Sequence, residues 1–150
     1  MASLAERFAH NVRRQRQELG WSQLKLAQAS GVDIRTVGRL ENNDGSITFE
    51  RAAAFADAMG VDLGVLFDTP IGVSFPDDTK KRRGGVSSAK VIANVRTRRE
   101  EKGFSQAALA KRAGIHKNHL SHAEKGERKL YLTTIEKLAA GLDVTPSELL

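Results

Sequence analysis

Arginine, lysine and histidine side chains carry most of the chemistry that this 150-residue chain can offer. Arg35 and Arg39 are four residues apart, so on a helix they share a face, where two guanidinium groups can bind anionic or hydrogen-bonding partners. His116, His119 and His122 recur every three residues, and imidazole nitrogens are ligands for Zn²⁺ or Ni²⁺. A third group is a run of four consecutive basic residues: Lys80, Lys81, Arg82 and Arg83.

Signatures of catalysis are missing from the sequence. The chain has no cysteine, which excludes disulfides and thiolate-ligated zinc or iron–sulfur sites. It also has no G-x-x-x-x-G-K-[ST] motif and no Ser-His-Asp arrangement, so neither enzyme activity nor a cofactor is expected. No N-terminal signal segment is visible and no apolar run approaches the ~18 residues of a membrane span, so we expect a soluble, cytoplasmic protein without a membrane partner.

The basic charge is unevenly distributed along the chain. Its 24 Lys and Arg and 18 Asp and Glu residues give a net charge of +6. Residues 1–67 are neutral, with eight side chains of each sign, residues 68–86 carry +1, and residues 87–150 carry +5. A basic excess is typical of proteins that bind polyanions, and here it indicates mainly the C-terminal half.

The chain contains an internal repeat. Residues 8–67 align without a gap on residues 91–150, at a constant shift of 83 residues. The segment between the copies is punctuated by Pro and Gly and has no apolar period, which indicates a linker. The sequence therefore predicts two tandem domains, 1–67 and 87–150, with a linker over 68–86. Identical pairs include Asn11/Asn94, Arg16/Arg99, Gln23/Gln106, Gly31/Gly114 and Glu41/Glu124.

Each repeat is predicted to be all-α with five short helices. Ser3 and Glu6 form a capping box at the start of the first helix, in which each side chain satisfies a free backbone amide. No segment alternates apolar and polar residues for long enough to indicate a strand. Further helix starts are expected at Ser22 and Ser105 for the second helices, Asp33 and His116 for the third, a Thr133–Glu136 capping box for the fourth helix of the second repeat, and Thr145 for its fifth.

A shared pattern runs from Gln23 to Arg39 and from Gln106 to His122. Counting the glutamine as position 1, both copies have Ala at position 5, Gly at position 9 and a branched aliphatic residue at position 15. The alanine lets two helices cross closely, the glycine suits a turn with positive φ, and the aliphatic side chain fills the core. With the preceding Val-Arg-x-x-Arg and the closing Glu, both copies resemble the phage repressor and Cro (Xre-like) family of helix-turn-helix proteins.

The resemblance implies two lambda-repressor-like helix-turn-helix domains, each with its third helix in the major groove of double-stranded DNA. Arg and Lys suit guanine, Asn suits adenine, and apolar groups suit the thymine methyl. Because the side chains differ between the copies, we expect an operator with two non-identical half-sites. The residues expected to contact DNA are Ile34, Arg35, Thr36 and Arg39 in the first domain and Lys117, Asn118, His119 and His122 in the second.

Other residues are expected at the phosphate backbone. In the family, the Gln that opens the second helix contacts phosphate, which implies this role for Gln23 and Gln106. The Arg that ends the first helix pairs with a Glu and faces a phosphate, which implies both roles for Arg16 and Arg99, with a purely structural ion pair as the alternative. The loop after the third helix is cationic only in the second copy, through Arg128 and Lys129 among others. The basic run is either an arm along DNA or a solvated linker.

The sequence thus predicts a DNA-binding transcription regulator, and more specifically a repressor from a bacterium, phage or mobile element, in which one chain reads two half-sites. A flexible 19-residue linker spans about 24 Å on average, and half-sites one helical turn apart need about 34 Å, within its extended reach of ~60 Å. One alternative is an antitoxin or adaptor whose first domain binds a protein, and another is a metal-responsive regulator. Self-association stays open, and with the fifth helix ending at Leu150 no small-molecule ligand is expected.

Overall fold

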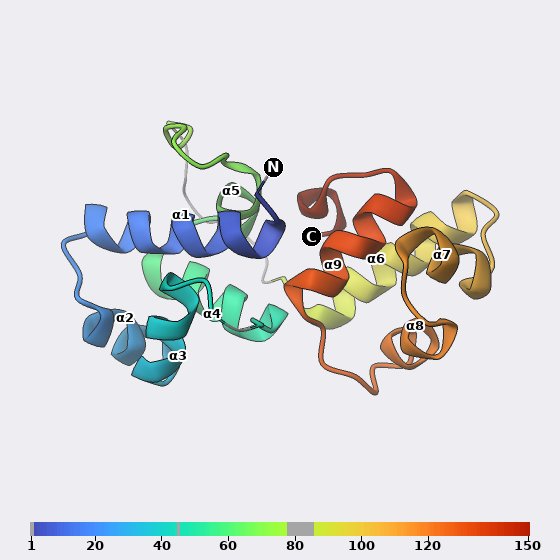
Figure 1. Cartoon of the computed structure of the whole chain (residues 1–150), viewed down its shortest axis with the longest axis horizontal. Helices are drawn as coiled ribbons and strands as arrows, with labels where there is room; N and C mark the ends of the chain where they lie inside the picture. Colours follow the sequence, from blue (N-terminus) through green and yellow to red (C-terminus); the bar gives the residue numbers. More distant parts are fainter. Residues whose placement is uncertain (1, 45, 78–85) are drawn as a thin grey trace.

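The computed structural model describes residues 2–44, 46–77 and 86–150. The predicted all-α fold is confirmed over these residues, where the one β-type pairing is an isolated bridge between Thr48 and Tyr131 (Figure 1). We call α1–α5 the first module and α6–η1 the second. Their elements are α1 (Leu4–Glu18), α2 (Gln23–Ser30), α3 (Ile34–Glu41), α4 (Phe49–Met59), α5 (Leu63–Asp68), α6 (Ser88–Glu101), α7 (Gln106–Ala113), α8 (Lys117–Glu124), α9 (Leu132–Leu142) and the 3-10 helix η1 (Pro146–Leu149).

Most of the predicted helix starts are confirmed. The Ser3 hydroxyl accepts a hydrogen bond from the Glu6 amide at 3.1 Å, and the Glu6 carboxylate accepts one from the Ser3 amide at 3.3 Å. Gly31 and Gly114 have φ of +71° and +72°, as the predicted turn between the second and third helices requires. At each predicted start of a second or third helix, the N-cap side chain accepts a hydrogen bond from a backbone amide two or three residues later: Ser22, Asp33, Ser105 and His116.

One predicted capping box is wrong. Helix α9 begins at Leu132, before Thr133, and its N-cap Tyr131 makes no side-chain capping bond. The backbone of Tyr131 takes part in the bridge to Thr48, so the extended chain passes directly into the helix. Glu136 therefore does not cap its own helix; its carboxylate accepts a hydrogen bond at 2.6 Å from the Leu4 amide of α1.

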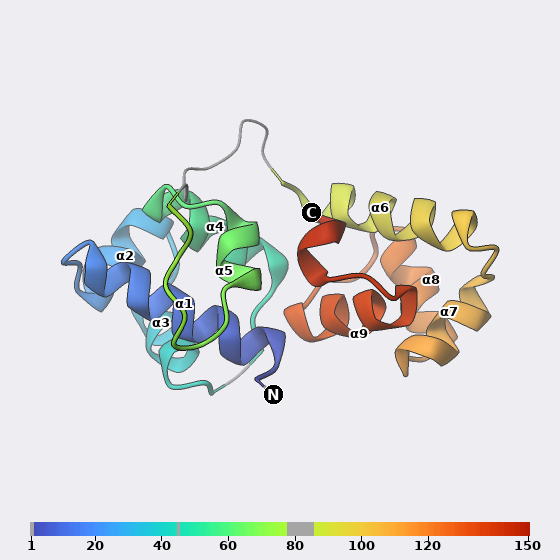
Figure 2. The ribbon, with the colours of Figure 1, turned by 90° about the horizontal axis from the view of Figure 1, so that it is seen from above.

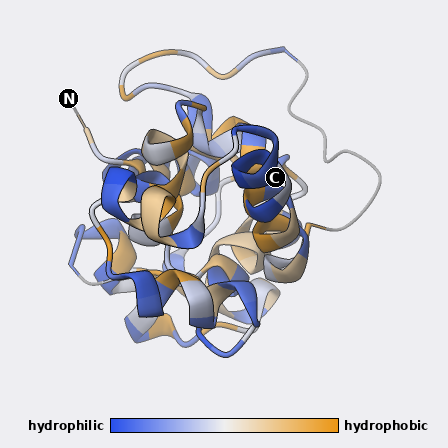
Figure 3. Cartoon of the chain, turned by 90° about the vertical axis from the view of Figure 1, so that its right-hand side faces the viewer, coloured by the Kyte–Doolittle hydropathy of each residue, from blue (hydrophilic) through white to orange (hydrophobic). Residues whose placement is uncertain are grey.

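An asparagine, fully buried in the first module and half-buried in the second, ties the first helix of each module to the end of its last helix. The Asn11 side chain is fully buried and donates to the carbonyl oxygens of Leu66 at 3.0 Å and Thr69 at 2.7 Å. The equivalent Asn94 donates to the carbonyl of Leu149 at 3.0 Å. Hydrophobic and hydrophilic residues alternate along the helices (Figure 3), and the buried residues are mostly the hydrophobic ones. The identity of this asparagine in the two copies therefore has a structural reason.

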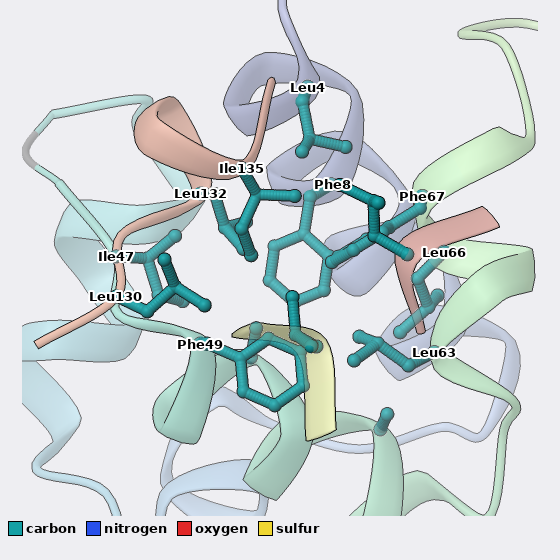
Figure 4. Packing of buried hydrophobic residues seen from close by; sticks show 14 of the residues in the cluster. Leu4, Phe8, Ile47, Phe49, Leu63, Leu66, Phe67, Leu130, Leu132 and Ile135 are labelled. Atoms are coloured by element: carbon teal, nitrogen blue, oxygen red, sulfur yellow. The ribbon is translucent and has the colours of Figure 1, made fainter. Parts of the chain in front are cut away.

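The two modules share a continuous apolar core. Helix α1 packs against α9, and α5 packs against η1, so the apolar cluster extends from one module into the other. Phe8, Phe49, Leu132 and Ile135 are essentially inaccessible to solvent at this boundary (Figure 4). Burial of apolar surface from both modules stabilises their association, so they form one body.

An approximate two-fold axis relates the modules. The Phe49 amide donates to the Leu130 carbonyl at 2.7 Å, and the Leu132 amide donates to the Ile47 carbonyl at 3.1 Å. The shift of 83 residues relates position 49 to 132 and position 47 to 130, so each bond is the counterpart of the other. This reciprocity is the pattern of an isologous interface. Seen from above, α1 and α6, and likewise α4 and α9, lie in positions related by a half-turn (Figure 2).

The described start of the linker packs along α1. The Arg14 guanidinium donates to the Val73 carbonyl and lies over the Phe75 ring, 4.3 Å from its centroid. These contacts hold the chain after α5 against the first module, which the expectation of a flexible tether did not include. The predicted basic run, residues 80–83, lies outside the described residues.

Replacing Asn11 with Ala is expected to lower the free energy of unfolding by about 1–3 kcal/mol, because the Leu66 and Thr69 carbonyls lose a buried donor. Urea-induced unfolding followed by circular dichroism measures the change. Asn94→Ala is the matched control, since Asn94 is partly exposed and makes one such bond. An equal or larger loss in the control would contradict the role given to Asn11.

Candidate nucleic-acid interface

Helices α3 and α8 lie along the same side of the molecule, one in each module (Figure 1). Their outward side chains correspond pair by pair. Thr36 and its partner His119 are half-buried, while the other expected base-reading side chains of both helices are exposed. The exposed ones are Ile34, Arg35 and Arg39 on α3 and Lys117, Asn118 and His122 on α8. The fold therefore presents two similar faces with different chemistry.

On α3, Asp33 holds Arg35. The Asp33 carboxylate accepts the Arg35 amide at 2.8 Å and the guanidinium Nε at 3.3 Å. The amide hydrogen bond, followed by the guanidinium contact, lowers the pKa of Asp33, which is therefore ionised at neutral pH. The Arg35 side chain is 85% exposed. The first module thus presents an exposed guanidinium on Arg35, hydrogen-bonded to the Asp33 carboxylate, and a second guanidinium on Arg39 one turn further along the helix.

On α8, two histidines lie in different environments. Burial, with Arg128 and Lys137 nearby, lowers the pKa of His119, so its imidazole is neutral at pH 7. His122 Nδ1 lies 2.7 Å from the carboxylate of Glu127, and this hydrogen bond lowers the pKa of Glu127. An open hollow of about 570 Å³ is lined by His116, Asn118, His119, His122, Glu127 and Arg128.

An arginine–glutamate pair, which we call the Arg–Glu clamp, fixes the third helix of each module to the first. Arg16 donates Nε and Nη2 to the two carboxylate oxygens of Glu41 at 2.9 and 2.6 Å, and Nη1 to the Trp21 carbonyl at 2.6 Å. Arg99 makes the same bonds to Glu124 and the Phe104 carbonyl. Both arginine side chains are 11% exposed. The pairing part of the expectation is confirmed, and the phosphate contact stays a prediction.

The two glutamines that open the second helices are half-buried. Gln106 donates its amide Nε2 to Glu124, and so joins the ion pair of Arg99. Gln23 instead lies with its side-chain oxygen next to Gly38 of α3. The same residue type thus has different neighbours in the two modules, and its predicted phosphate contact is not tested by this geometry.

The loops after α3 and α8 differ in charge. Arg128 and Lys129 are exposed in the second module, as are Lys125 and Glu127. The first module has Gly45 and Ser46 at the positions of the first two, and Asn42 and Asp44 at the positions of the other two. Lys80, Lys81, Arg82 and Arg83 lie outside the described residues, so their place relative to either loop stays a prediction.

Three features of the site were not anticipated from the sequence. They are the Asp33–Arg35 pair, the His122–Glu127 pair and the packing of the modules against each other. In the sequence, the available signal for these two pairs was a basic and an acidic residue two positions apart (Asp33 and Arg35) or five positions apart (His122 and Glu127). Among the described residues, no cluster of histidine and acidic side chains has the geometry to hold a metal ion, and His116 instead caps α8 through Nδ1. No described helix is long and apolar enough to cross a membrane.

Comparison with known families gives the same unit twice. A helix-turn-helix family model matches residues 12–66 and again residues 95–149, which together make up most of the chain. The chain belongs to this helix-turn-helix family, of the Xre or Cro/C1 type. Its members are DNA-binding transcription regulators, and both matched segments contain the helix pair and the Arg–Glu clamp described above.

Two individual proteins are similar to parts of this helix-turn-helix chain. One is a hypothetical transcription factor of Neisseria meningitidis serogroup B, 39% identical over 62 residues, which make up 41% of this chain and 58% of the relative. The chain therefore spans less than two thirds of that relative. The other is the crystal structure of the restriction-modification controller protein C.AhdI from Aeromonas hydrophila, 36% identical, with a TM-score of 0.41, covering 42% of this chain and 96% of C.AhdI.

Arg99→Lys is expected to lower the free energy of unfolding by about 1–3 kcal/mol, because lysine keeps the charge but cannot reproduce the planar, two-pronged contact with Glu124. Arg96→Lys on the same helix is the control, since Arg96 makes an exposed pair with Glu100 that contributes about 0.5 kcal/mol or less. Thermal unfolding of both variants measures the difference. Equal losses would show that the clamp does not stabilise the module.

Proposed function

We propose that this chain is a sequence-specific transcriptional repressor that binds double-stranded DNA as a single chain, with α3 and α8 in successive major grooves. The observation that carries the proposal is the approximate two-fold axis, which brings both helices to one side of the molecule. Occupation of a promoter by such a protein would block access by RNA polymerase. A cytoplasmic location, in a bacterium or a phage-infected cell, follows from this proposal.

The symmetry of the module pairing indicates the arrangement of the half-sites. Two helix-turn-helix units related by a two-fold axis match half-sites that are inverted relative to each other. Half-sites one turn apart are separated by about 34 Å along the duplex. Because both modules belong to one chain, no second chain has to bind before both half-sites are contacted, which favours a one-to-one complex.

The two modules would contribute differently to DNA binding. The first offers Arg35 and Arg39, which suit guanine, and Ile34 and Thr36, which suit the methyl group of thymine. The second offers Lys117 for guanine and Asn118 for adenine, and its cationic loop suits phosphates. We therefore propose a pseudo-palindromic operator whose halves differ in sequence, with the second module as the stronger electrostatic anchor. The basic run over residues 80–83 would add further phosphate contacts as an arm.

A second candidate function has one observation in its favour. Leu24 and Ile34 of the first module are 52% and 44% exposed, whereas the second module has Ala107 and Lys117 there. Exposed apolar side chains are also typical of surfaces that bind proteins. In that case the first module would bind a partner protein, as in an antitoxin or adaptor, and the second alone would hold DNA.

Selection of bound sequences from a random DNA pool with the full chain separates the two functions. The proposed repressor selects two different, inverted motifs about one helical turn apart and protects both from cleavage. A selected sequence with only one motif, protected over one turn, would favour the adaptor. Two motifs in direct orientation would contradict the symmetric arrangement.

Arg35→Ala and Arg39→Ala are each expected to weaken operator binding by about 1–3 kcal/mol and to relax base preference in the half-site of the first module only. Arg51→Ala is the control, because Arg51 is an exposed arginine on α4 of the same module. Competition titrations with operators mutated in one half-site measure both effects. Unchanged base preference in both variants would show that this face of α3 does not read DNA.

Arg128→Ala is expected to reduce the slope of log K against log salt concentration by about 1, with little change in base preference, because a phosphate contact releases counterions but carries no sequence information. Lys90→Ala, at the first turn of α6, should leave the slope unchanged. An equal reduction in both variants would mean that the effect reports net charge alone.

A further inference from the structure

Among the described residues, the backbone hydrogen bonds between the modules are few and lie close to the axis. The two backbone hydrogen bonds, from Phe49 to Leu130 and from Leu132 to Ile47, sit on either side of the Thr48–Tyr131 bridge. Such a pair resists separation of the modules but allows them to rock about the bridge. The surrounding apolar contacts hold the modules together but are not directional, so they do not by themselves select one angle. A contact away from the axis would fix the angle between the modules.

Glu136 makes such a contact. Its carboxylate is half-buried on α9 of the second module and accepts a hydrogen bond from the amide of Leu4, the first residue of α1, at 2.6 Å. That amide has no acceptor within its own helix, and the N-terminus of a helix carries positive partial charge. The bond is therefore charge-assisted, and it complements the Ser3–Glu6 capping box at the same helix end.

This contact is one-sided, and so is the packing around it, since α1 packs closely against α9 whereas their counterparts α6 and α4 make little contact. Under the 83-residue shift Glu136 corresponds to Ala53 and Leu4 corresponds to Ser87, so an alanine methyl stands where a second carboxylate would be. A second off-axis bond, from the Ser147 hydroxyl to the Asp68 carboxylate at 2.7 Å, is exposed to water. The half-buried Glu136 bond is the stronger restraint on the angle, since water competes less for its partners.

Helix α1 transmits this restraint to the DNA-facing side. Its first residue is held by Glu136, and Arg16 near its other end is clamped to Glu41 at the end of α3. A helix of 15 residues is about 22 Å long. A tilt of about 10° at one end moves the other by about 4 Å, which is close to one base-pair step.

We infer that Glu136 is a positioning residue that sets the distance between α3 and α8, and through it the half-site spacing that the protein prefers. The inference rests on the proposed function, in which both helices bind DNA. Glu136 touches no DNA in this account. It acts through α1, and its removal changes the protein's tolerance for different half-site spacings more than the base preference of either module.

The test uses the full chain and operators obtained by selection with the unaltered protein, with one to two base pairs added to or removed from the spacer. The unaltered protein is expected to prefer one spacing by about tenfold over its neighbours, and Glu136→Ala by about twofold. Glu136→Gln, which keeps an oxygen acceptor, should recover much of the preference. Thr133→Ala, an exposed position on the same helix, is the control. An unchanged spacing profile in Glu136→Ala would overturn the inference.

A second measurement needs no DNA and separates the two proposals. The chain has no cysteine, so Gln28→Cys and Lys111→Cys, at equivalent exposed positions of α2 and α7, allow specific spin labelling. Glu136→Ala is expected to broaden or shift the distance distribution between the labels, and an identical distribution would overturn the positioning role. If the unaltered protein selects no paired motifs, the proposed function fails, while the label distances still decide whether Glu136 fixes the modules.

Discussion

The backbone bonds between Phe49 and Leu130 and between Leu132 and Ile47 join two short segments that precede α4 and α9. We call these two bonds the joint. Apolar side chains from both modules pack around it, so the chain forms one body with an approximate two-fold axis. The relative position of α3 and α8 depends on this joint, because the Arg–Glu clamps fix each third helix to its own first helix. Without the joint, the two helix-turn-helix units would be independent heads on a tether.

The same scaffold carries two different faces. Residues that hold the scaffold together recur in both modules, including the asparagine between first and last helix, the Arg–Glu clamp and the turn glycine. Residues on the outer side of α3 and α8 diverge, and so does the charge of the loops that follow. This division is what repeated binding units with separate specificities require, since the geometry must be shared while the base contacts differ.

The sequence predicted local structure well because the signals are local. Ser3, Ser22 and Ser105 cap helices through side chains a few residues away, and Gly31 and Gly114 supply positive φ at the turn. It did not predict the joint, because Phe8, Phe49 and Leu132 look like residues of a module core. The wrong capping box at Glu136 has the same origin: a carboxylate three residues into a helix suits that helix, unless another helix end lies closer in space. The positions of the exposed residues on α3 and α8 followed from the repeat, but the pairing of Arg35 with Asp33 and of His122 with Glu127 did not.

Amide hydrogen exchange at Phe49 and Leu132 tests the joint most directly. These are the first residues of α4 and α9, whose amides have no acceptor within their own helices. Protection therefore requires the bonds across the module boundary. We expect both amides in the free, full-length chain to exchange nearly as slowly as the amides of the buried core, as measured by NMR. Exchange at the rate of an exposed amide, with the module cores still protected, would contradict the single-body account.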